Sequence, residues 1–305
     1  MDTLSLTISQ EQNSDTVNLA DLPLSDMLAL LNQHDACVPQ AISQVLPQVE
    51  ASVRLITAQL KKGGRLFYVG AGTSGRLGVL DSAECPPTFG TDPEQIQAVI
   101  AGGLDAMLRA VENVEDDRSA AVETLRCRKL AAEDVVLGIA ASGRTPFVLA
   151  ALDYAREVGA KTIALTTRGL STISQHADIA IAPDVGAEVL SGSTRMKSGS
   201  AQKMLLGMIS TAVMTQLGKV HGNFMIDVKA SNEKLYRRAE HMVQQICAID
   251  EPGARALLQS VGYSVRAAVL RQMLNLTPEK ALARAAEPFR SLTSQLGTGG
   301  EQHGE

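Results

Sequence analysis

The stretch from Arg65 to Gly90, RLFYVGAGTSGRLGVLDSAECPPTFG, constrains the fold of this chain more than any other. Its apolar run, Leu66 to Val69, predicts a buried strand. A turn rich in glycine and hydroxyl groups follows over residues 70–75, and apolar periodicity predicts a helix over 75–84. Glycines let the backbone approach a ligand, while the free N–H groups and dipole of a helix N-terminus attract an anion. The stretch therefore predicts an anion site at the start of this helix.

The residues Gly70 to Gly75 also match the G-x-G-x-x-G pattern of dinucleotide sites. Such a site needs an acidic residue at the end of the next strand, where it holds a ribose hydroxyl. The next predicted strand, at 96–100, ends in Ala-Gly-Gly and offers no carboxylate. The turn carries Gly72 and two hydroxyl groups, those of Thr73 and Ser74, which suit a terminal phosphate monoester better than a buried pyrophosphate. We therefore favour a phosphate ligand over a dinucleotide.

Strands and helices alternate through the middle of the chain. Beyond the first strand, the predicted elements are strands at 96–100, 135–140, 162–165 and 179–182, and helices at 104–129 and 146–158. Strands separated by helices form right-handed crossovers and a parallel sheet buried on both faces. The sequence therefore predicts the α/β class, with a doubly wound, flavodoxin-like sheet of five parallel strands.

The remainder of the chain is helical or polar. A short helix at 25–31 and a longer one at 42–60, kinked at Pro47, are predicted before the sheet. The expected divisions are an N-terminal arm at 1–20, disordered or packed on a partner, an α/β domain with the N-terminal helices at 21–248, a small region of three helices at 249–296, and a flexible tail at 297–305.

The Ser-Gly-Arg of the first turn, which begins at Ser74, occurs again after the third predicted strand. There the chain reads Ser142, Gly143, Arg144 and Thr145. In a doubly wound sheet, turns that leave neighbouring strands flank one crevice at the carboxyl ends of the strands, where ligands bind. Serine also caps helices, and a single such turn would indicate no more than a cap. Two turns at equivalent points of the topology favour a phosphate cradle.

Two cations follow the last predicted strand. From Ser191 the chain reads SGSTRMKSGSAQKMLLG, a cluster of hydroxyl groups and glycines that carries Arg195 and Lys197 and runs into a long apolar helix. One interpretation is a capped core helix with two solvated cations. The other is that both cations form a third wall of the anion pocket.

Composition limits the classes of partner. The net charge is −5 without a basic stripe, and aromatic residues make up only 3% of the chain, which argues against nucleic acid. The four cysteines are scattered, as expected for reduced thiols, and the histidines lack metal-ligand spacing. The start resembles no signal peptide, and the longest apolar-rich segment, Met204 to Leu217, is too short and too polar to span a bilayer. We expect a cytoplasmic protein that binds neither nucleic acid nor membrane.

Six runs of sequence, spread from about residue 22 to 290, resemble one known family. The runs are GAGTSGR, SAECPPTFG, AVENVEDD, GIAASGRTP, TRMKSGSAQK and ASNEKL. Together they resemble the N-acetylmuramic acid 6-phosphate etherases, which are built on a sugar isomerase (SIS) domain. The resemblance implies cleavage of the D-lactyl ether of N-acetylmuramic acid 6-phosphate to N-acetylglucosamine 6-phosphate and D-lactate, a step in recycling cell-wall amino sugars. The family's usual Arg-Asn-Pro start appears here only as Asn13.

The resemblance also implies roles for two glutamates. An ether oxygen leaves poorly unless it is protonated, and the hydrogen on sugar carbon 2 is acidic only beside an open-chain aldehyde. The reaction therefore needs an acid at the carbon 3 oxygen, a base at carbon 2 and a phosphate anchor, but no redox cofactor or metal. The resemblance assigns Glu84 as the acid and Glu115 as the base. Glu112, expected one helical turn before Glu115, is held in reserve, and His221 is a candidate for opening the sugar ring.

Two other functions stay open at this point. An aldose–ketose isomerase would use the same anchor and base without an acid for a leaving group, and a sugar-phosphate sensor would bind without turnover. We also expect a homodimer that supplies pocket residues across its interface. One SIS domain leaves a pocket edge open, and the apolar helices at 22–60 and 201–218 exceed what one face of the sheet needs.

Overall fold

The computed structural model describes residues 12–297, which form two compact units. The first consists of residues 12–82 and 94–209, and the second of residues 83–93 and 210–297. Two long helices, α5 (Gly72–Phe89) and α9 (Lys197–Gln216), contribute residues to both units. The predicted boundary at residue 249 differs from this division, because it lies inside the second unit.

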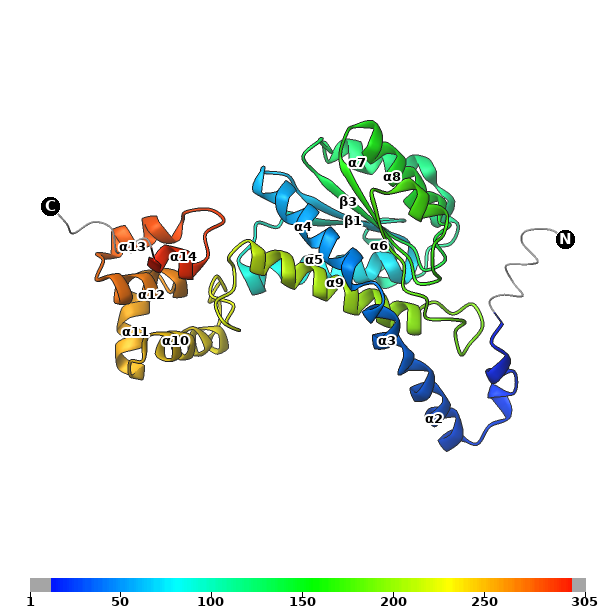
Figure 1. The fold of residues 1–305 in the computed structure, drawn as a ribbon, viewed down its shortest axis with the longest axis horizontal. Helices are drawn as coiled ribbons and strands as arrows, with labels where there is room; N and C mark the ends of the chain where they lie inside the picture. The colour runs from blue at the N-terminus through cyan, green and yellow to red at the C-terminus, as the bar shows by residue number, and fades with distance from the viewer. Residues whose placement is uncertain (1–11, 298–305) are drawn as a thin grey trace. The chain divides into compact units, whose positions relative to one another are not determined.

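A five-stranded parallel sheet forms the centre of the first unit (Figure 1). Its strands are β1 (Leu66–Gly70), β2 (Ile96–Ile100), β3 (Val135–Ile139), β4 (Lys161–Leu165) and β5 (Ile179–Ile181). They lie in the order β2-β1-β3-β4-β5, and every neighbouring pair is parallel. The predicted fold class is confirmed. The strand order reverses at β1, so the crevice where ligands bind in such sheets lies at the carboxyl ends of β1 and β3.

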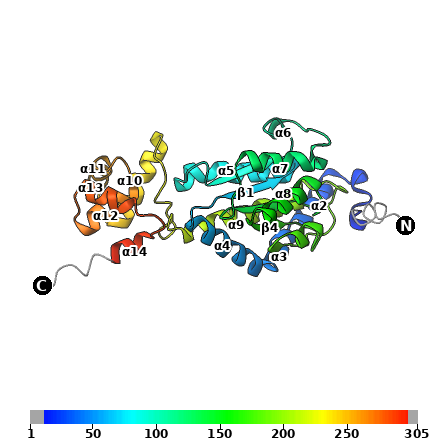
Figure 2. The same ribbon diagram turned by 90° about the horizontal axis from the view of Figure 1, so that it is seen from above.

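Helices cover both faces of this sheet, as Figures 1 and 2 show. On one face, α7 (Arg118–Cys127) and α8 (Pro146–Glu157) pack on apolar side chains of the strands, including Phe67 and Val136. On the other face lies α5, whose Gly78 approaches Tyr68 closely. The sheet is therefore buried on both faces, as a parallel sheet requires.

The N-terminal region differs in detail from its prediction. The order is η1 (Ser14–Thr16), η2 (Leu19–Asp21), α2 (Leu24–Asp35), α3 (Cys37–Ser43) and α4 (Leu46–Lys61). The predicted kinked helix at 42–60 is two helices, because Pro47 occupies the first turn of α4, where its missing N–H costs nothing. The described part of the arm contacts its own chain, since the buried Thr16 Oγ1 donates to the Val189 carbonyl oxygen at 2.9 Å. Residues 1–11 of the predicted arm lie outside the described residues.

The predicted helix at 104–129 is wrong. The segment holds α6 (Asp105–Leu108), a loop, η3 (Val114–Asp116) and only then α7. Asn113 has a positive φ of 64°, which no helix interior allows. The carboxylate of Asp117 accepts the N–H of Ala120 at 2.9 Å and so starts a new helix.

Helix α5 is longer than the predicted 75–84. It begins at Gly72, because Gly75 N–H already donates to the Ala71 carbonyl oxygen at 3.2 Å, so most of the glycine turn is the first helical turn. It ends at Phe89 and runs through Pro86 and Pro87, where a loop was predicted. These prolines supply no N–H to the helix.

The second unit gathers α10 (Glu233–Cys247), α11 (Glu251–Gln259), α12 (Val265–Leu274), α13 (Pro278–Ala285) and α14 (Leu292–Gly297) around one apolar cluster. Ser264 and Thr277 cap α12 and α13, as their sequence positions suggest. Residues 249–297 form four helices where three were predicted, and the rest of the predicted tail, 298–305, lies outside the described residues. No helix within 12–297 is long and apolar enough to cross a membrane.

Two helical glycines provide a test of the packing between α5 and the sheet. A Cβ at Gly78 would lie 2.9 Å from Tyr68 Cβ, whereas a Cβ at Gly207 in α9 would meet nothing within 4 Å. We expect Gly78→Ala to lower the free energy of unfolding by about 1–3 kcal/mol through overpacking. Gly207→Ala should raise it by about 0.5–1 kcal/mol, because alanine favours a helix. Urea unfolding of both variants checks this, and equal midpoints would contradict the close packing.

Candidate active site

The carboxyl ends of β1 and β3 lie side by side, with Gly70 opposite Ile139. Strand β1 leads through Ala71 directly into α5. Strand β3 leads through residues 140–145 into α8. Both Ser-Gly-Arg turns therefore leave neighbouring strands at the point where the strand order reverses.

The first turn of α5 presents one hydroxyl group that is already engaged. Gly72 is exposed with a φ of +51°, and Thr73 is half-buried. Ser74 is 7% exposed, and its Oγ donates to Gln202 Oε1 of α9 at 2.9 Å. Gln202 thus joins the site, although the sequence contains no local signal for it, because 128 residues separate it from Ser74.

The start of α9 leaves hydrogen-bonding capacity unused beside this turn. Gln202 Nε2 and Ser198 Oγ are buried and have no hydrogen-bond partner among the described residues. A Cβ at Gly199 would lie 3.4 Å from Thr73 Cγ2, so the first turns of α9 and α5 are in contact. If the Gln202 amide turned by 180°, its NH₂ would donate to Ser74 Oγ. The O–H of Ser74 would then be available to donate to another acceptor. The pair can then offer a donor to a ligand oxygen.

The turn after β3 carries two half-buried hydroxyl groups, those of Ser142 and Thr145. Gly143 has a φ of +67°, and a Cβ there would lie 1.7 Å from Ser171 Oγ, so only glycine fits. Ser142 is half-buried, and its hydroxyl makes no hydrogen bond to any described residue. Thr145 precedes α8 without making a side-chain cap. Arg144 is exposed at the edge of the turn. These groups can donate to phosphate oxygens at the N-terminus of α8.

The start of α9 is occupied by a carboxylate of the protein itself. Glu188 is 1% exposed, and its two oxygens accept the N–H groups of Lys197 and Ser198 at 3.0 and 2.9 Å. Lys197 is 3% exposed, and its Nζ donates to the Val185 carbonyl oxygen at 2.7 Å, so it is not a solvated cation. Arg195 is exposed. The α9 N-terminus therefore has no vacancy for an external anion, whereas the starts of α5 and α8 do.

The segment that carries Glu188 is held by the N-terminal region. Asn13 Nδ2 donates to the Ala187 carbonyl oxygen at 3.4 Å, and Cys37 Sγ contacts the Val185 carbonyl oxygen at 3.7 Å. Together with the bond from Thr16 to Val189, these contacts fix the backbone on both sides of Glu188. The arm therefore supports the site through its own chain.

The structure places Glu115 in η3 of the first unit, where it is exposed. Glu112 lies in the preceding loop rather than one helical turn earlier, so the predicted shared helix face is wrong. Asp117 is the exposed N-cap residue of α7. The hydroxyl of Ser119, at 2.6 Å, and the N–H of Ala120 stabilise its carboxylate and lower the pKa of Asp117 below its usual value. The cap fixes the start of α7 directly after Glu115.

Glu84 is exposed on α5, in the part of that helix that belongs to the second unit. It lies about three helical turns after Gly72. His221, also in the second unit, exchanges backbone hydrogen bonds with Phe224 at 2.9 and 3.0 Å. Within residues 12–297, no group of three or more His, Cys, Asp or Glu side chains could hold a metal ion.

A parallel sheet with hydroxyl-bearing helix starts at its switch point is the arrangement of the SIS-domain class. Residues 114–212 match the family model described as the SIS domain, residues 48–156 match the glucokinase regulatory protein N-terminal SIS domain, and residues 222–287 match the C-terminal lid domain of that protein. A phosphoheptose isomerase from Francisella tularensis has the same fold, with a TM-score of 0.51 and 16% identity over 64% of this chain and all of that one.

Full-length relatives narrow the class to a family. The chain is 49% identical to an N-acetylmuramic acid 6-phosphate etherase from Pasteurella multocida over 90% of this chain and 91% of the relative. It is 46% identical to one from Staphylococcus aureus over 90% of this chain and 92% of the relative. The chain belongs to the N-acetylmuramic acid 6-phosphate etherase family.

Proposed function

We propose that the chain cleaves the D-lactyl ether of N-acetylmuramic acid 6-phosphate, yielding N-acetylglucosamine 6-phosphate and D-lactate. It would act as a carbon–oxygen lyase through elimination followed by addition of water. Its membership of the etherase family supports the reaction. The observation that carries the proposal is the pair of open helix starts on neighbouring strands, with the third start closed by Glu188.

The phosphate group is held at the two open helix starts. The backbone at Gly72 and the hydroxyl groups of Thr73 and Ser74 supply one side. Ser142 and Thr145, with the backbone at Gly143 and the guanidinium of Arg144, supply the other. Lys197 takes a supporting role, because its ammonium group holds Val185 in the segment before Glu188. The exposed Arg195 remains a candidate for the sugar or the lactyl carboxylate.

The chemistry needs two proton transfers. Glu115 removes the carbon 2 hydrogen of the open-chain aldehyde, and the electron pair forms the carbon 2–carbon 3 double bond as the carbon 3–oxygen bond breaks. Glu84 gives its proton to the departing lactyl oxygen. Water then adds at carbon 3, and a proton returns to carbon 2. No group outside the protein, the sugar and water is consumed.

The two glutamates can be separated with the product as a probe. N-acetylglucosamine 6-phosphate carries the carbon 2 hydrogen but no lactyl group. In heavy water, deuterium should enter carbon 2 with wild type and with Glu84→Gln, but not with Glu115→Gln. Release of D-lactate should fall by about 10²–10⁴-fold in both variants, the usual cost of losing a general acid or base. NMR of carbon 2 and a D-lactate assay measure these outcomes.

The reverse pattern of exchange would mean that the two roles are exchanged. Exchange with both variants would place the base elsewhere, with Glu112 the next candidate. If wild type releases no D-lactate from N-acetylmuramic acid 6-phosphate, the proposed function itself is wrong.

Ser142→Ala tests the phosphate cradle. A hydrogen bond to a charged group contributes about 1.5–3 kcal/mol, so binding of the phosphorylated sugar should weaken by about 10- to 150-fold. Ser43→Ala is the matched control, because that exposed hydroxyl donates to the Gln40 carbonyl oxygen and accepts from Gln44 Nε2, both local contacts at α3. Calorimetry with N-acetylglucosamine 6-phosphate measures the affinities. Equal affinities of the two variants, or equal cleavage of the unphosphorylated sugar by wild type, would contradict the cradle.

We also propose a homodimer in which Glu84 acts on substrate held by the other copy. Along α5, Glu84 lies about 18 Å beyond Gly72, and its side chain reaches back by about 5 Å. Six covalent bonds, about 9 Å at most, join the phosphorus to the carbon 3 oxygen. A sugar anchored at one end of α5 cannot reach the acid on the same helix. Exposed apolar side chains, among them Leu24, Leu28, Met204 and Met208, supply surface for a second copy.

Mixed dimers test this arrangement. Glu84→Gln and Glu115→Gln are each inactive alone, but a mixed dimer contains one pocket with both native glutamates if Glu84 acts across the interface. Unfolding and refolding the two variants together in equal amounts should restore about a quarter of the wild-type rate, because half of the dimers are mixed and each has one complete pocket. No restoration, or a fully active monomer in sedimentation, would contradict the proposal.

A further inference from the structure

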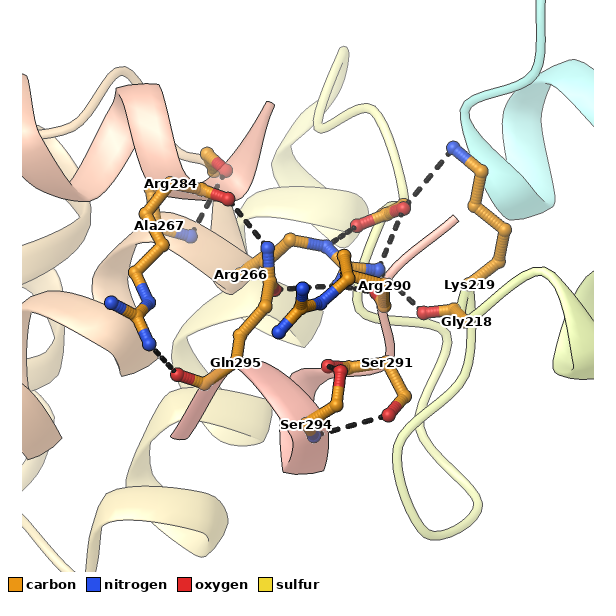
Figure 3. A network of polar contacts seen from close by, with 11 residues as sticks. Gly218, Lys219, Arg266, Ala267, Arg284, Arg290, Ser291, Ser294 and Gln295 are labelled. Carbon is orange, nitrogen blue, oxygen red and sulfur yellow. Dashed lines mark hydrogen bonds and ion pairs between the residues drawn. The ribbon is translucent and has the colours of Figure 1, made fainter. Parts of the chain in front are cut away.

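Arg266 of α12 is a charged side chain that is only 5% exposed. Figure 3 shows it within a network of polar contacts. Its Nε donates to Asp227 Oδ1 at 2.7 Å and its Nη2 to Asp227 Oδ2 at 3.0 Å, in a bidentate pair. A buried ion pair of this kind adds little net stability compared with apolar side chains of similar volume, but it fixes geometry because its hydrogen bonds are directional.

The remaining donors of Arg266 join distant segments of the second unit. Nη1 donates to the Arg290 carbonyl oxygen at 2.8 Å and to Gln295 Oε1 at 3.0 Å. Nη2 also donates to the Gly218 carbonyl oxygen at 2.5 Å, two residues after the end of α9. Lys219 Nζ lies 3.2 Å from Asp227 Oδ2 (Figure 3). The Asp227 carboxylate is thus held by two cations from different segments.

The backbone of Asp227 lies against the end of α5. Gly90, the residue after that helix, has a φ of +63°, and a Cβ there would lie 2.3 Å from the Asp227 carbonyl oxygen. Its N–H donates to the Pro86 carbonyl oxygen at 3.0 Å and closes the last turn. Asp227 is therefore fixed on one side by Arg266 and contacts the α5 terminus on the other.

The end of α5 lacks two of its helical hydrogen bonds. Pro86 and Pro87 lack N–H groups, so the carbonyl groups of Ser82 and Ala83 receive none from the following turn. Glu84 directly follows these two residues. Its position therefore depends on what holds the residues after the prolines, and there Asp227 packs on Gly90.

We propose that Asp227, held by Arg266, is the positioning residue for Glu84. This inference rests on the proposed role of Glu84 as the acid that protonates the lactyl oxygen. The pair acts through the backbone contact of Asp227 with Gly90 and touches no substrate. Loosening the contact displaces the acid and leaves the carbon 2 base in η3 unaffected.

Two variants loosen the contact in different ways. Asp227→Asn weakens the bidentate pair, and Gly90→Ala drives a Cβ into the Asp227 carbonyl oxygen while leaving Arg266 and Asp227 intact. We expect each variant to lower the rate of D-lactate release by about 10²-fold, the size of effect expected from misplacing a catalytic group by about 1 Å. Deuterium exchange at carbon 2 of N-acetylglucosamine 6-phosphate should stay within about threefold of wild type.

Leu258→Ala is the matched control. Leu258 is fully buried in the apolar cluster of the second unit, so its truncation destabilises that unit while Arg266, Asp227 and Gly90 keep their native side chains. Rates are compared per folded molecule, with the folded fraction measured by circular dichroism. The control should leave the ratio of lactate release to exchange at its wild-type value.

The outcomes separate the inference from the proposed function. If both contact variants lower the two rates in the same ratio as Leu258→Ala, the contact is only structural and the inference is wrong. If wild type exchanges carbon 2 but Glu84→Gln releases lactate at the wild-type rate, the assigned acid is wrong instead. Gly90→Ala retains the buried ion pair, so it keeps the inference testable even if Asp227→Asn does not fold.

Discussion

The contact between α5 and the sheet is the constraint on which the rest of the site depends. A Cβ at Gly75 would lie 2.6 Å from Ile100 Cγ1 and 2.7 Å from the Gly70 carbonyl oxygen. The helix can start directly at the end of β1 because position 75 is a glycine and carries no side chain. The contact therefore places the positive end of the α5 dipole at the switch point of the sheet, beside the strand that leads to Ser142.

The three helix starts of the first unit that could attract an anion are treated differently by the protein. The starts of α5 and α8 lie at the carboxyl ends of β1 and β3. Around them are hydroxyl groups and buried polar groups that have no hydrogen-bond partner among the described residues. The start of α9 is closed by Glu188, whose carboxylate offsets the partial charges of the N–H groups. This difference leaves the starts of α5 and α8 as the places where we propose that the phosphate group binds. The closed start of α9 also accounts for the burial of Lys197. Its ammonium group donates to the Val185 carbonyl oxygen and so supports the segment before Glu188.

The sequence predicted the parts of the fold that depend on local pattern. Apolar runs located all five strands to within one residue at each end, and the repeated Ser-Gly-Arg located both turns. The prediction of one helix at 104–129 was wrong because the apolar periodicity of the sequence continues across the end of α6. Only Asn113 and the cap at Asp117 indicate that the helix is interrupted there. Gln202 and Glu188 were missed because their roles depend on partners that only the folded chain brings near, and no spacing rule indicates them. The roles proposed for Glu84 and Glu115 come from family resemblance, and the fold alone would not have suggested them.

Both ends of α5 are fixed by the same device, a glycine placed against a backbone carbonyl oxygen. Gly75 meets Gly70 at the start, and Gly90 meets Asp227 at the end. Contacts between backbone atoms allow less adjustment than contacts between flexible side chains, because a Cβ at either glycine would displace a strand or a loop rather than a rotamer. The residues between these two contacts, Glu84 among them, therefore lie on one helix whose ends both pack against backbone atoms.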